Sequence, residues 1–199
     1  MSALALEVRE HRDRVGLKGP RAAEWLAANG IPLPAAPNTW AQSEESQSAD
    51  PLLVARLGTS EFFLEDGAAG TALKRISRSL DAPTPGVYPV IREDWAFLLG
   101  GEGVHEVLAQ VCNVNFAALP LDSHPVIMTL MIGVAVLVVP QNEPGERRGP
   151  AERGDAVGRG DAAGRRYRIW CDPTFGPYMS ESLRAVVIES GGSYRGASG

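Results

Sequence analysis

Several features that would direct a search for function are scarce in this chain of 199 residues. Its only two cysteines, Cys112 and Cys171, are too few for a disulfide framework. Nineteen lysines and arginines stand against 24 aspartates and glutamates, so no basic excess favours a phosphate backbone, and we expect no nucleic-acid partner. The N-terminus lacks the cationic start and long apolar core of a signal peptide. We therefore expect a cytoplasmic protein with reduced thiols.

One apolar run, residues 126–139, has the sequence VIMTLMIGVAVLVV and contains no charge. A membrane span needs about 20 apolar residues, and prolines at positions 125 and 140 bracket this shorter run. Because the run is rich in Val and Ile and is divided by Gly133, we interpret it as one bent strand or two short consecutive strands, buried on both faces. We expect no membrane insertion.

An internal match organises much of the chain. Residues 19–27 (GPRAAEWLA) align without gaps on residues 101–109 (GEGVHEVLA), and the two stretches share Gly, Glu, Leu and Ala. Each follows a short apolar run, so the repeated unit begins as a strand, a glycine turn and a helix. The side chains expected to face inward from these helices are Ala22, Trp25, Leu26, Val104, Val107, Leu108 and Val111.

The likeness continues in each half as a hairpin and a second helix. Apolar runs at 52–57 and 61–66 flank a short turn that contains glycine, which is typical of a hairpin. The second half offers a comparable pair at 133–139 and 167–172. Amphipathic helices follow at 72–80 and 177–187, with expected inward residues Leu73, Ile76, Leu80, Tyr178, Met179, Leu183 and Val186.

These elements predict an α+β fold with two pseudo-symmetric strand–helix–hairpin–helix halves. We place a single domain at residues 14–190, with halves at about 14–81 and 87–190. Neither half is long enough to form a stable core alone, so one shared body is expected.

Two further segments have compositions that disfavour packing. Residues 141–166 are rich in Arg, Gly and acidic residues and nearly devoid of apolar side chains, which predicts a disordered insert at a hairpin tip. Contact between its arginines and an acidic partner is the alternative interpretation. Residues 191–199 (GGSYRGASG) are predicted to form a flexible tail.

The sequence contains no recognisable catalytic motif. The glycines at 100–103 lack the spacing of a dinucleotide or phosphate loop. His11, His105 and His124 have no second ligand at a metal-binding spacing, so no metal site is expected, and His105 is predicted to face outward. Cys112 and Cys171 are interpreted as buried thiols. A Cys/His nucleophilic pair stays open, although no local motif supports one.

Polar residues near helix starts and turns have structural explanations. Asp66 and Asp172 come just before the second helix of each half, where a carboxylate accepts hydrogen bonds from free backbone amides. Ser60 with Glu61 lies at a hairpin turn, and Ser180 with Glu181 lies in a first helical turn. We therefore assign no catalytic residue.

Two long stretches carry a family resemblance. They are residues 94–116 (DWAFLLGGEGVHEVLAQVCNVNF) and 167–183 (YRIWCDPTFGPYMSESL). With the G-x-x-A-x-x-x-L pattern from Gly19 and the L-G-x-x-E-x-x-L pattern from Leu57, the chain resembles the gamma subunit of heterotetrameric sarcosine oxidase. That family is related to the folate-binding aminomethyltransferase of the glycine cleavage system. The likeness covers most of residues 14–187.

The resemblance implies a small, non-catalytic, non-flavin subunit that binds no cofactor itself. Its partners would be larger flavoprotein subunits, to which the resemblance assigns FAD, FMN, NAD and tetrahydrofolate. Those subunits would demethylate sarcosine or a similar N-methyl amine and pass the one-carbon unit to tetrahydrofolate. The insert at 141–166 and the longer connector at 116–123 depart from the family pattern, and they allow another partner, such as an N-methylglutamate dehydrogenase-like complex.

Two hypotheses follow for the role of this chain. A permanent subunit should expose aromatic residues at its interface, and the candidates are Trp40, Trp170, Phe175 and Tyr178, with a core position equally expected for Trp170. A free-standing folate-binding aminomethyltransferase-like protein instead needs a pocket between the halves with a carboxylate for the pterin ring. The carboxylates available for that role are Glu61, Asp66, Asp94 and Asp172.

Overall fold

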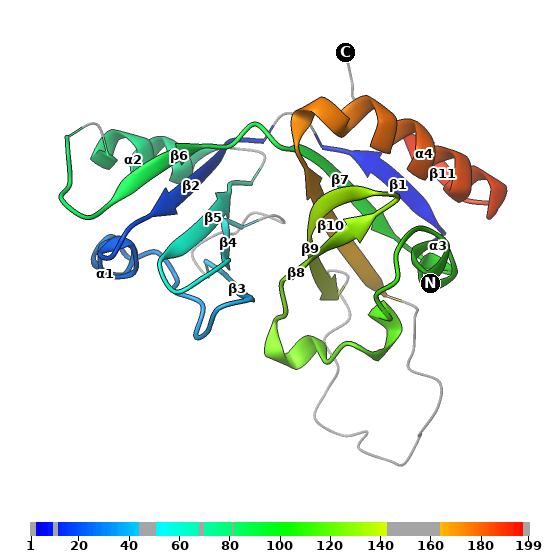
Figure 1. Cartoon of the computed structure of the whole chain (residues 1–199), viewed down its shortest axis with the longest axis horizontal. Helices are drawn as coiled ribbons and strands as arrows, with labels where there is room; N and C mark the ends of the chain where they lie inside the picture. The colour runs from blue at the N-terminus through cyan, green and yellow to red at the C-terminus, as the bar shows by residue number, and fades with distance from the viewer. Residues whose placement is uncertain are drawn as a thin grey trace. The chain divides into compact units, whose positions relative to one another are not determined.

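The computed structural model describes residues 3–9, 12–43, 51–67, 70–80, 82–142 and 164–196. The chain divides into two compact units, each a sheet with helices (Figure 1). We call His11–Asp94 with Ser123–Val126 the first unit, and Met1–Glu10, Trp95–Asp122 and Ile127–Gly199 the second unit. The mixed α+β composition confirms that part of the sequence prediction. The predicted pseudo-symmetry concerns the relation between the units and stays a prediction.

The first unit is built on a five-stranded sheet in the order β3-β4-β5-β2-β6. Every neighbouring pair in it is antiparallel. Figure 1 shows α1 and α2 on the same side of this sheet. The elements are β2 (Arg14–Lys18), α1 (Ala22–Ala28), β3 (Thr39–Gln42), β4 (Leu53–Arg56), β5 (Glu61–Glu65), α2 (Thr71–Leu80) and β6 (Tyr88–Ile91).

The core of the first unit lies between this sheet and its two helices. Leu26 of α1 and Leu73 and Ile76 of α2 are buried with residues of β2, β4 and β5, as their helical spacing predicts. Trp25 and Leu80 pack against this core but are only partly buried, so their predicted inward positions are confirmed in part. Gly19 follows β2 with φ of 125°, and a Cβ there would lie 2.3 Å from the carbonyl oxygen of Gly86, so the turn requires glycine.

The second unit is built on a six-stranded sheet in the order β11-β1-β7-β10-β9-β8. β1 and β11 pair in parallel, and the other pairs are antiparallel. Residues of α3 and α4 share one apolar core with the sheet. The elements are β1 (Ala5–Val8), β7 (Trp95–Gly100), α3 (Val104–Val111), β8 (Ile127–Met131), β9 (Val134–Asn142), β10 (Arg165–Cys171), α4 (Gly176–Glu189) and β11 (Ser193–Arg195), with 3-10 helices η1 (Phe116–Ala118), η2 (Leu121–Ser123, which ends in the first unit) and η3 (Pro173–Phe175).

The apolar run at 126–139 forms two consecutive strands, which was one of the two predicted arrangements. β8 and β9 are joined by Ile132 and Gly133, which have φ of 47° and 80° and make a tight hairpin turn. Burial on both faces was wrong for β8, because Met128 and Leu130 are 55% and 61% exposed on this edge strand. Among the described residues, no helix combines the length and apolar character needed to cross a bilayer.

The strands extend into both segments that we expected to be unpacked. The predicted insert began at residue 141 and ended at 166, but Gln141 lies within β9, and Arg165 and Arg166 begin β10. Residues 143–163 of the insert lie outside the described residues. Ser193–Arg195 of the predicted tail form β11 beside β1, which differs from the expected flexible tail, and residues 197–199 lie outside the described range.

Helix α4 confirms most, but not all, of its predicted inward face. Met179 and Leu183 are fully buried, and Val186 is partly buried. Tyr178 is 50% exposed, so its predicted inward position was wrong. Its hydroxyl donates to the backbone oxygen of Ile132 at 3.2 Å, and this hydrogen bond holds the ring at the surface. Cys112 and Cys171 are buried and form no disulfide bond, as predicted.

We predict that Gly176→Ala destabilises the second unit. A Cβ at Gly176 would lie 2.3 Å from Cδ2 of Trp95, so the indole or the start of α4 must shift. Overpacking of this kind costs about 1–3 kcal/mol, which urea denaturation will measure. Gly58→Ala is the matched control, because its nearest neighbour is Cβ of Glu61 at 3.8 Å. Equal stability of both variants would contradict the prediction.

Candidate functional site

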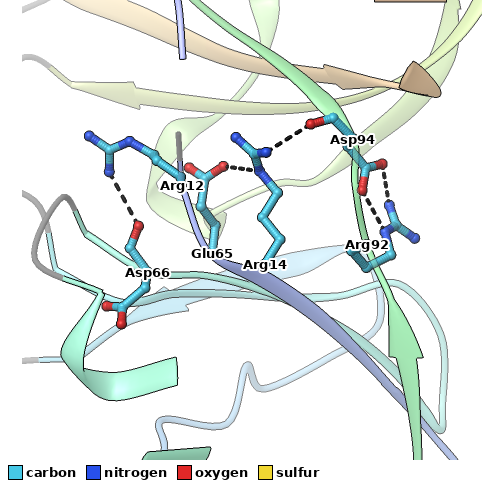
Figure 2. A network of polar contacts seen from close by, with 6 residues as sticks. All are labelled: Arg12, Arg14, Glu65, Asp66, Arg92 and Asp94. Carbon is cyan, nitrogen blue, oxygen red and sulfur yellow. Dashed lines mark hydrogen bonds and ion pairs between the residues drawn. The ribbon is translucent and has the colours of Figure 1, made fainter. Parts of the chain in front are cut away.

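An ion pair between two buried charged side chains joins two strands of the first unit. Arg14 begins β2 and Glu65 ends β5, and the two residues are directly opposite in the strand register. Arg14 Nε donates to Glu65 Oε2 at 2.7 Å, and each side chain is only 3% exposed. Arg14 Nη1 also donates to the backbone oxygen of Asp94 at 2.8 Å (Figure 2). One guanidinium therefore connects the ends of β2 and β5 to the segment after β6.

A second arginine neutralises the side chain of Asp94. Arg92 Nε and Nη2 donate to the two carboxylate oxygens of Asp94, each at 2.8 Å. The Arg92 guanidinium also lies 4.9 Å from the centre of the Phe63 ring, which favours a cation–π contact. This bidentate pair fixes the chain where it leaves β6.

A third arginine completes what we call the arginine–carboxylate network, made of Arg12, Arg14, Glu65, Asp66, Arg92 and Asp94 (Figure 2). Arg12 Nη1 donates to the backbone oxygen of Asp66 at 3.3 Å. The network assembles because β5, β2 and β6 are adjacent and antiparallel. The end of β5, the start of β2 and the end of β6 therefore lie at the same end of these three neighbouring strands.

Asp66 has the capping role that its position predicts. It is buried, and its two carboxylate oxygens accept from the backbone N–H groups of Gly67 and Leu73, both at 2.8 Å. Leu73 lies in the first turn of α2, so the carboxylate satisfies a free amide there.

Asp172 has the equivalent role before η3 in the second unit. Its Oδ1 accepts from the backbone N–H of Thr174 at 2.9 Å and from the hydroxyl of Thr174 at 2.5 Å. These hydrogen bonds lower the pKa of Asp172, because they stabilise the charged carboxylate. The prediction of a structural carboxylate is confirmed here too.

The structure does not gather the four candidate carboxylates into one site. Asp66 and Asp94 join the network, whereas Glu61 lies at the other end of β5 and pairs with exposed Lys18 at 3.0 Å. Asp172 belongs to the second unit. Each of the four therefore has a partner within its own unit. Asp66 and Asp94 hold a helix start and a strand end in this arrangement.

The sequence analysis missed Glu65 and Arg14. Both lie on strands whose alternating pattern marks them as facing away from Val15 and Leu64, so a strand register was the signal that would have paired them. Without the strand register, the sequence does not show that these two charged residues lie opposite each other.

The aromatic candidates occupy different environments. Trp170, on β10, is 1% exposed, so its predicted position at an exposed interface was wrong and its core position is confirmed. Trp40 is partly buried and stacks on His124, with 4.6 Å between ring centres. Phe175 and Tyr178 are 48% and 50% exposed at the start of α4. Of the four candidates, only these last two are about half exposed to solvent.

The histidines also differ from expectation. His105 does not point freely outward, since its Nε2 lies 2.6 Å from the hydroxyl oxygen of Tyr167. His124 lies beside the edge strand β3, where its backbone oxygen accepts from Trp40. His11 lies outside the described residues. Among the residues that the structure describes, no group of three His, Cys, Asp or Glu side chains is placed to hold a metal ion.

Comparisons with known proteins show the fold. No family model matches the sequence, and no curated protein matches it. The aminomethyltransferase T of the glycine cleavage system from Bartonella henselae is structurally similar, with a TM-score of 0.60 and 16% identity. Heterotetrameric sarcosine oxidase from Corynebacterium sp. U-96, in complex with pyrrole 2-carboxylate, is similar with a TM-score of 0.63 and 19% identity. The predicted relation to the aminomethyltransferase fold is therefore confirmed.

The two likenesses differ in how much of each known chain they span. Each covers 92% of this chain. The chain spans 45% of the aminomethyltransferase, which is less than half of that protein. It spans 83% of the sarcosine oxidase chain. At these identities the likenesses extend to the fold and not to activity.

We predict that Arg14→Met costs about 3–5 kcal/mol of unfolding free energy, because it breaks a buried ion pair by removing one of its two charges. Arg14→Met combined with Glu65→Met should recover part of that loss. Urea denaturation will measure both. Lys18→Met is the matched control, because Lys18 and Glu61 pair across the same two strands but are 53% and 38% exposed. It should cost less than about 1 kcal/mol, and an equal loss would contradict the prediction.

Proposed function

We propose that this chain is a small non-flavin subunit of a multi-subunit oxidoreductase of the sarcosine oxidase type. Its larger partner subunits would hold FAD, FMN, NAD and tetrahydrofolate and would demethylate sarcosine or a similar N-methyl amine. The observation that carries the proposal is the extent of the structural likeness. The fold spans 83% of the sarcosine oxidase chain but only 45% of the aminomethyltransferase, so the chain matches a subunit of the complex more fully than a complete transferase.

The state of the candidate carboxylates supports a role in assembly. Both oxygens of Asp66 accept from backbone amides, and both oxygens of Asp94 accept from Arg92. Glu65 is buried against Arg14. Use of any of these groups as a base would first require breaking an ion pair or a helix cap, and that cost disfavours catalysis by them.

The surface at the start of α4 supports a permanent contact. Phe175 and Tyr178 are about half exposed and lie three residues apart at the junction of η3 and α4. Aromatic side chains are enriched in protein interfaces because they bury a large area with little loss of conformational freedom. We assign these two residues to the contact with a larger subunit.

A free-standing folate-binding aminomethyltransferase-like protein is the alternative, and the shared fold favours it. Tetrahydrofolate, when bound, would supply the acceptor for a one-carbon unit. The alternative needs a carboxylate free to bind the pterin ring, and Glu61, Asp66, Asp94 and Asp172 each have a protein partner. The described residues therefore fit the subunit role better.

Co-purification tests the subunit role. Full-length chain with a C-terminal tag, expressed in its natural host, should retain larger partners whose absorbance spectrum shows bound flavin. Phe175→Ala with Tyr178→Ala should reduce flavin recovery by at least about tenfold, because a central aromatic contact contributes about 2 kcal/mol or more. Ile188→Ala, on an exposed position near the other end of α4, is the control and should retain the partners. A chain purified as a monomer without flavin would overturn the proposal.

Calorimetric titration with tetrahydrofolate distinguishes the two candidate functions. The isolated chain should release no measurable heat of binding, because Asp66 and Asp94 are already held by backbone amides and by Arg92. Saturable binding with one ligand per chain would favour the transferase-like alternative. Loss of that binding in Asp94→Asn, with unchanged thermal stability, would then assign the site.

A further inference from the structure

The end of α1 in the first unit carries the chain's one Asn-Gly step, Asn29–Gly30. In an unstructured chain this dipeptide readily loses the asparagine side-chain amide, because glycine has no Cβ to shield its backbone nitrogen. Asn29 is partly buried and Gly30 is exposed, so solvent water reaches the turn. How fast this step reacts therefore depends on how the folded turn holds it.

A full set of backbone hydrogen bonds closes the turn. The N–H of Ile31 donates to the oxygen of Leu26 at 3.0 Å, and the N–H of Gly30 donates to the oxygen of Ala27 at 3.1 Å. With Gly30 at φ of 68°, these two bonds form a Schellman motif. Leu26 and Ile31 are both buried in the core of the first unit, so burial of Ile31 and closure of the turn depend on each other.

The closed turn keeps the reacting atoms of Asn29 and Gly30 apart. Asn29 Nδ2 donates to the backbone oxygen of Trp25 at 2.8 Å, which directs the side-chain amide toward the preceding turn of α1. Ring closure between the two residues needs Cβ of Asn29 and the nitrogen of Gly30 nearly eclipsed about the Cα–C bond. At the observed ψ of 12°, the Gly30 nitrogen nearly eclipses the backbone nitrogen of Asn29 instead.

We propose that Asn29 is a modification site, protected in the closed turn and converted to aspartate or isoaspartate when the C-terminal turn of α1 opens. In the open turn the Gly30 nitrogen attacks Cγ of Asn29, and a new C–N bond forms. The side-chain nitrogen leaves as ammonia and takes the proton of the Gly30 N–H. Water then opens the cyclic imide at either of its two carbonyl groups.

Each product weakens the turn that delayed its formation. Aspartate lacks the donor that Asn29 directs at Trp25, and it places a negative charge at the negative end of the α1 dipole. Isoaspartate also lengthens the backbone by one methylene between residues 29 and 30. That insertion disturbs the spacing on which the hydrogen bonds of Gly30 and Ile31 depend. The modification therefore leaves the end of α1 open once it has occurred.

Peptide mapping by mass spectrometry, on full chain incubated in water enriched in oxygen-18, tests the site. At pH 7.5 the folded protein should convert Asn29 at least about tenfold more slowly than the same chain in guanidinium chloride, because attack waits for local opening. In the denaturant, where folding plays no part, Gly30→Ala should slow conversion at least about fivefold, since its Cβ hinders the attack. Equal rates in folded and denatured chain, or no conversion in the denaturant, would overturn the proposal.

Two buried isoleucines of the same core show whether local opening limits the reaction. Ile31→Ala loosens the turn itself, so conversion in the folded chain, relative to the same variant in denaturant, should rise about threefold to tenfold. Ile76→Ala on α2 is the matched control, because the two side chains are 3% and 2% exposed, and it should stay within about twofold of the unaltered chain. Equal acceleration by both variants would contradict opening at the turn.

Urea below the unfolding transition gives a further test that needs no variant. Opening of one turn exposes little surface, so conversion of Asn29 in the unaltered chain should stay nearly constant as urea is added. A steep rise from the lowest urea concentrations would show that the whole unit must unfold first, and it would overturn the proposal even if Ile31→Ala failed to fold.

Discussion

The ion pair between Arg14 and Glu65 is the contact on which the arrangement of the first unit depends. It is buried, it joins two strands at the centre of the sheet, and its guanidinium also binds the backbone of Asp94. Charges that are so far removed from water stabilise a fold only when their partners are held at short distance and good geometry. Asp66, which follows Glu65, caps the start of α2, and Arg14 binds the backbone of Asp94 after β6, so both elements are tied to the strands that carry the pair.

The same requirement accounts for how the first unit uses its buried carboxylates. Arginines and helix amides occupy the carboxylates of Glu65, Asp66 and Asp94. Aromatic surface remains exposed elsewhere, on Phe175 and Tyr178. Exposed aromatic side chains of this kind are enriched in protein interfaces, in keeping with the proposed subunit role.

The sequence predicted what local spacing determines. Helical periodicity placed Leu26, Leu73 and Leu183 in the core correctly, and Gly19 marked its turn. The sequence did not predict the Arg14–Glu65 pair or the contact of His105 with Tyr167. Each depends on which residues face each other across elements that are distant in the sequence. Tyr178 was misplaced for a related reason: its hydroxyl finds the carbonyl of Ile132, and helical spacing alone does not reveal a polar partner in a turn.

The pairing of β2 with β5 has a consequence for how the chain avoids misfolding. Gly16 lies opposite Phe63, between the Arg14–Glu65 pair and the Lys18–Glu61 pair. A slip by two residues would keep every side chain on its own face, so hydrophobic patterning alone would tolerate it. In either direction, however, such a slip brings Phe63 opposite Arg14 or Lys18 and separates both ion pairs. The small residue between two opposite-charge pairs therefore favours a single alignment of these two strands, which are separated in the sequence by α1, β3 and β4.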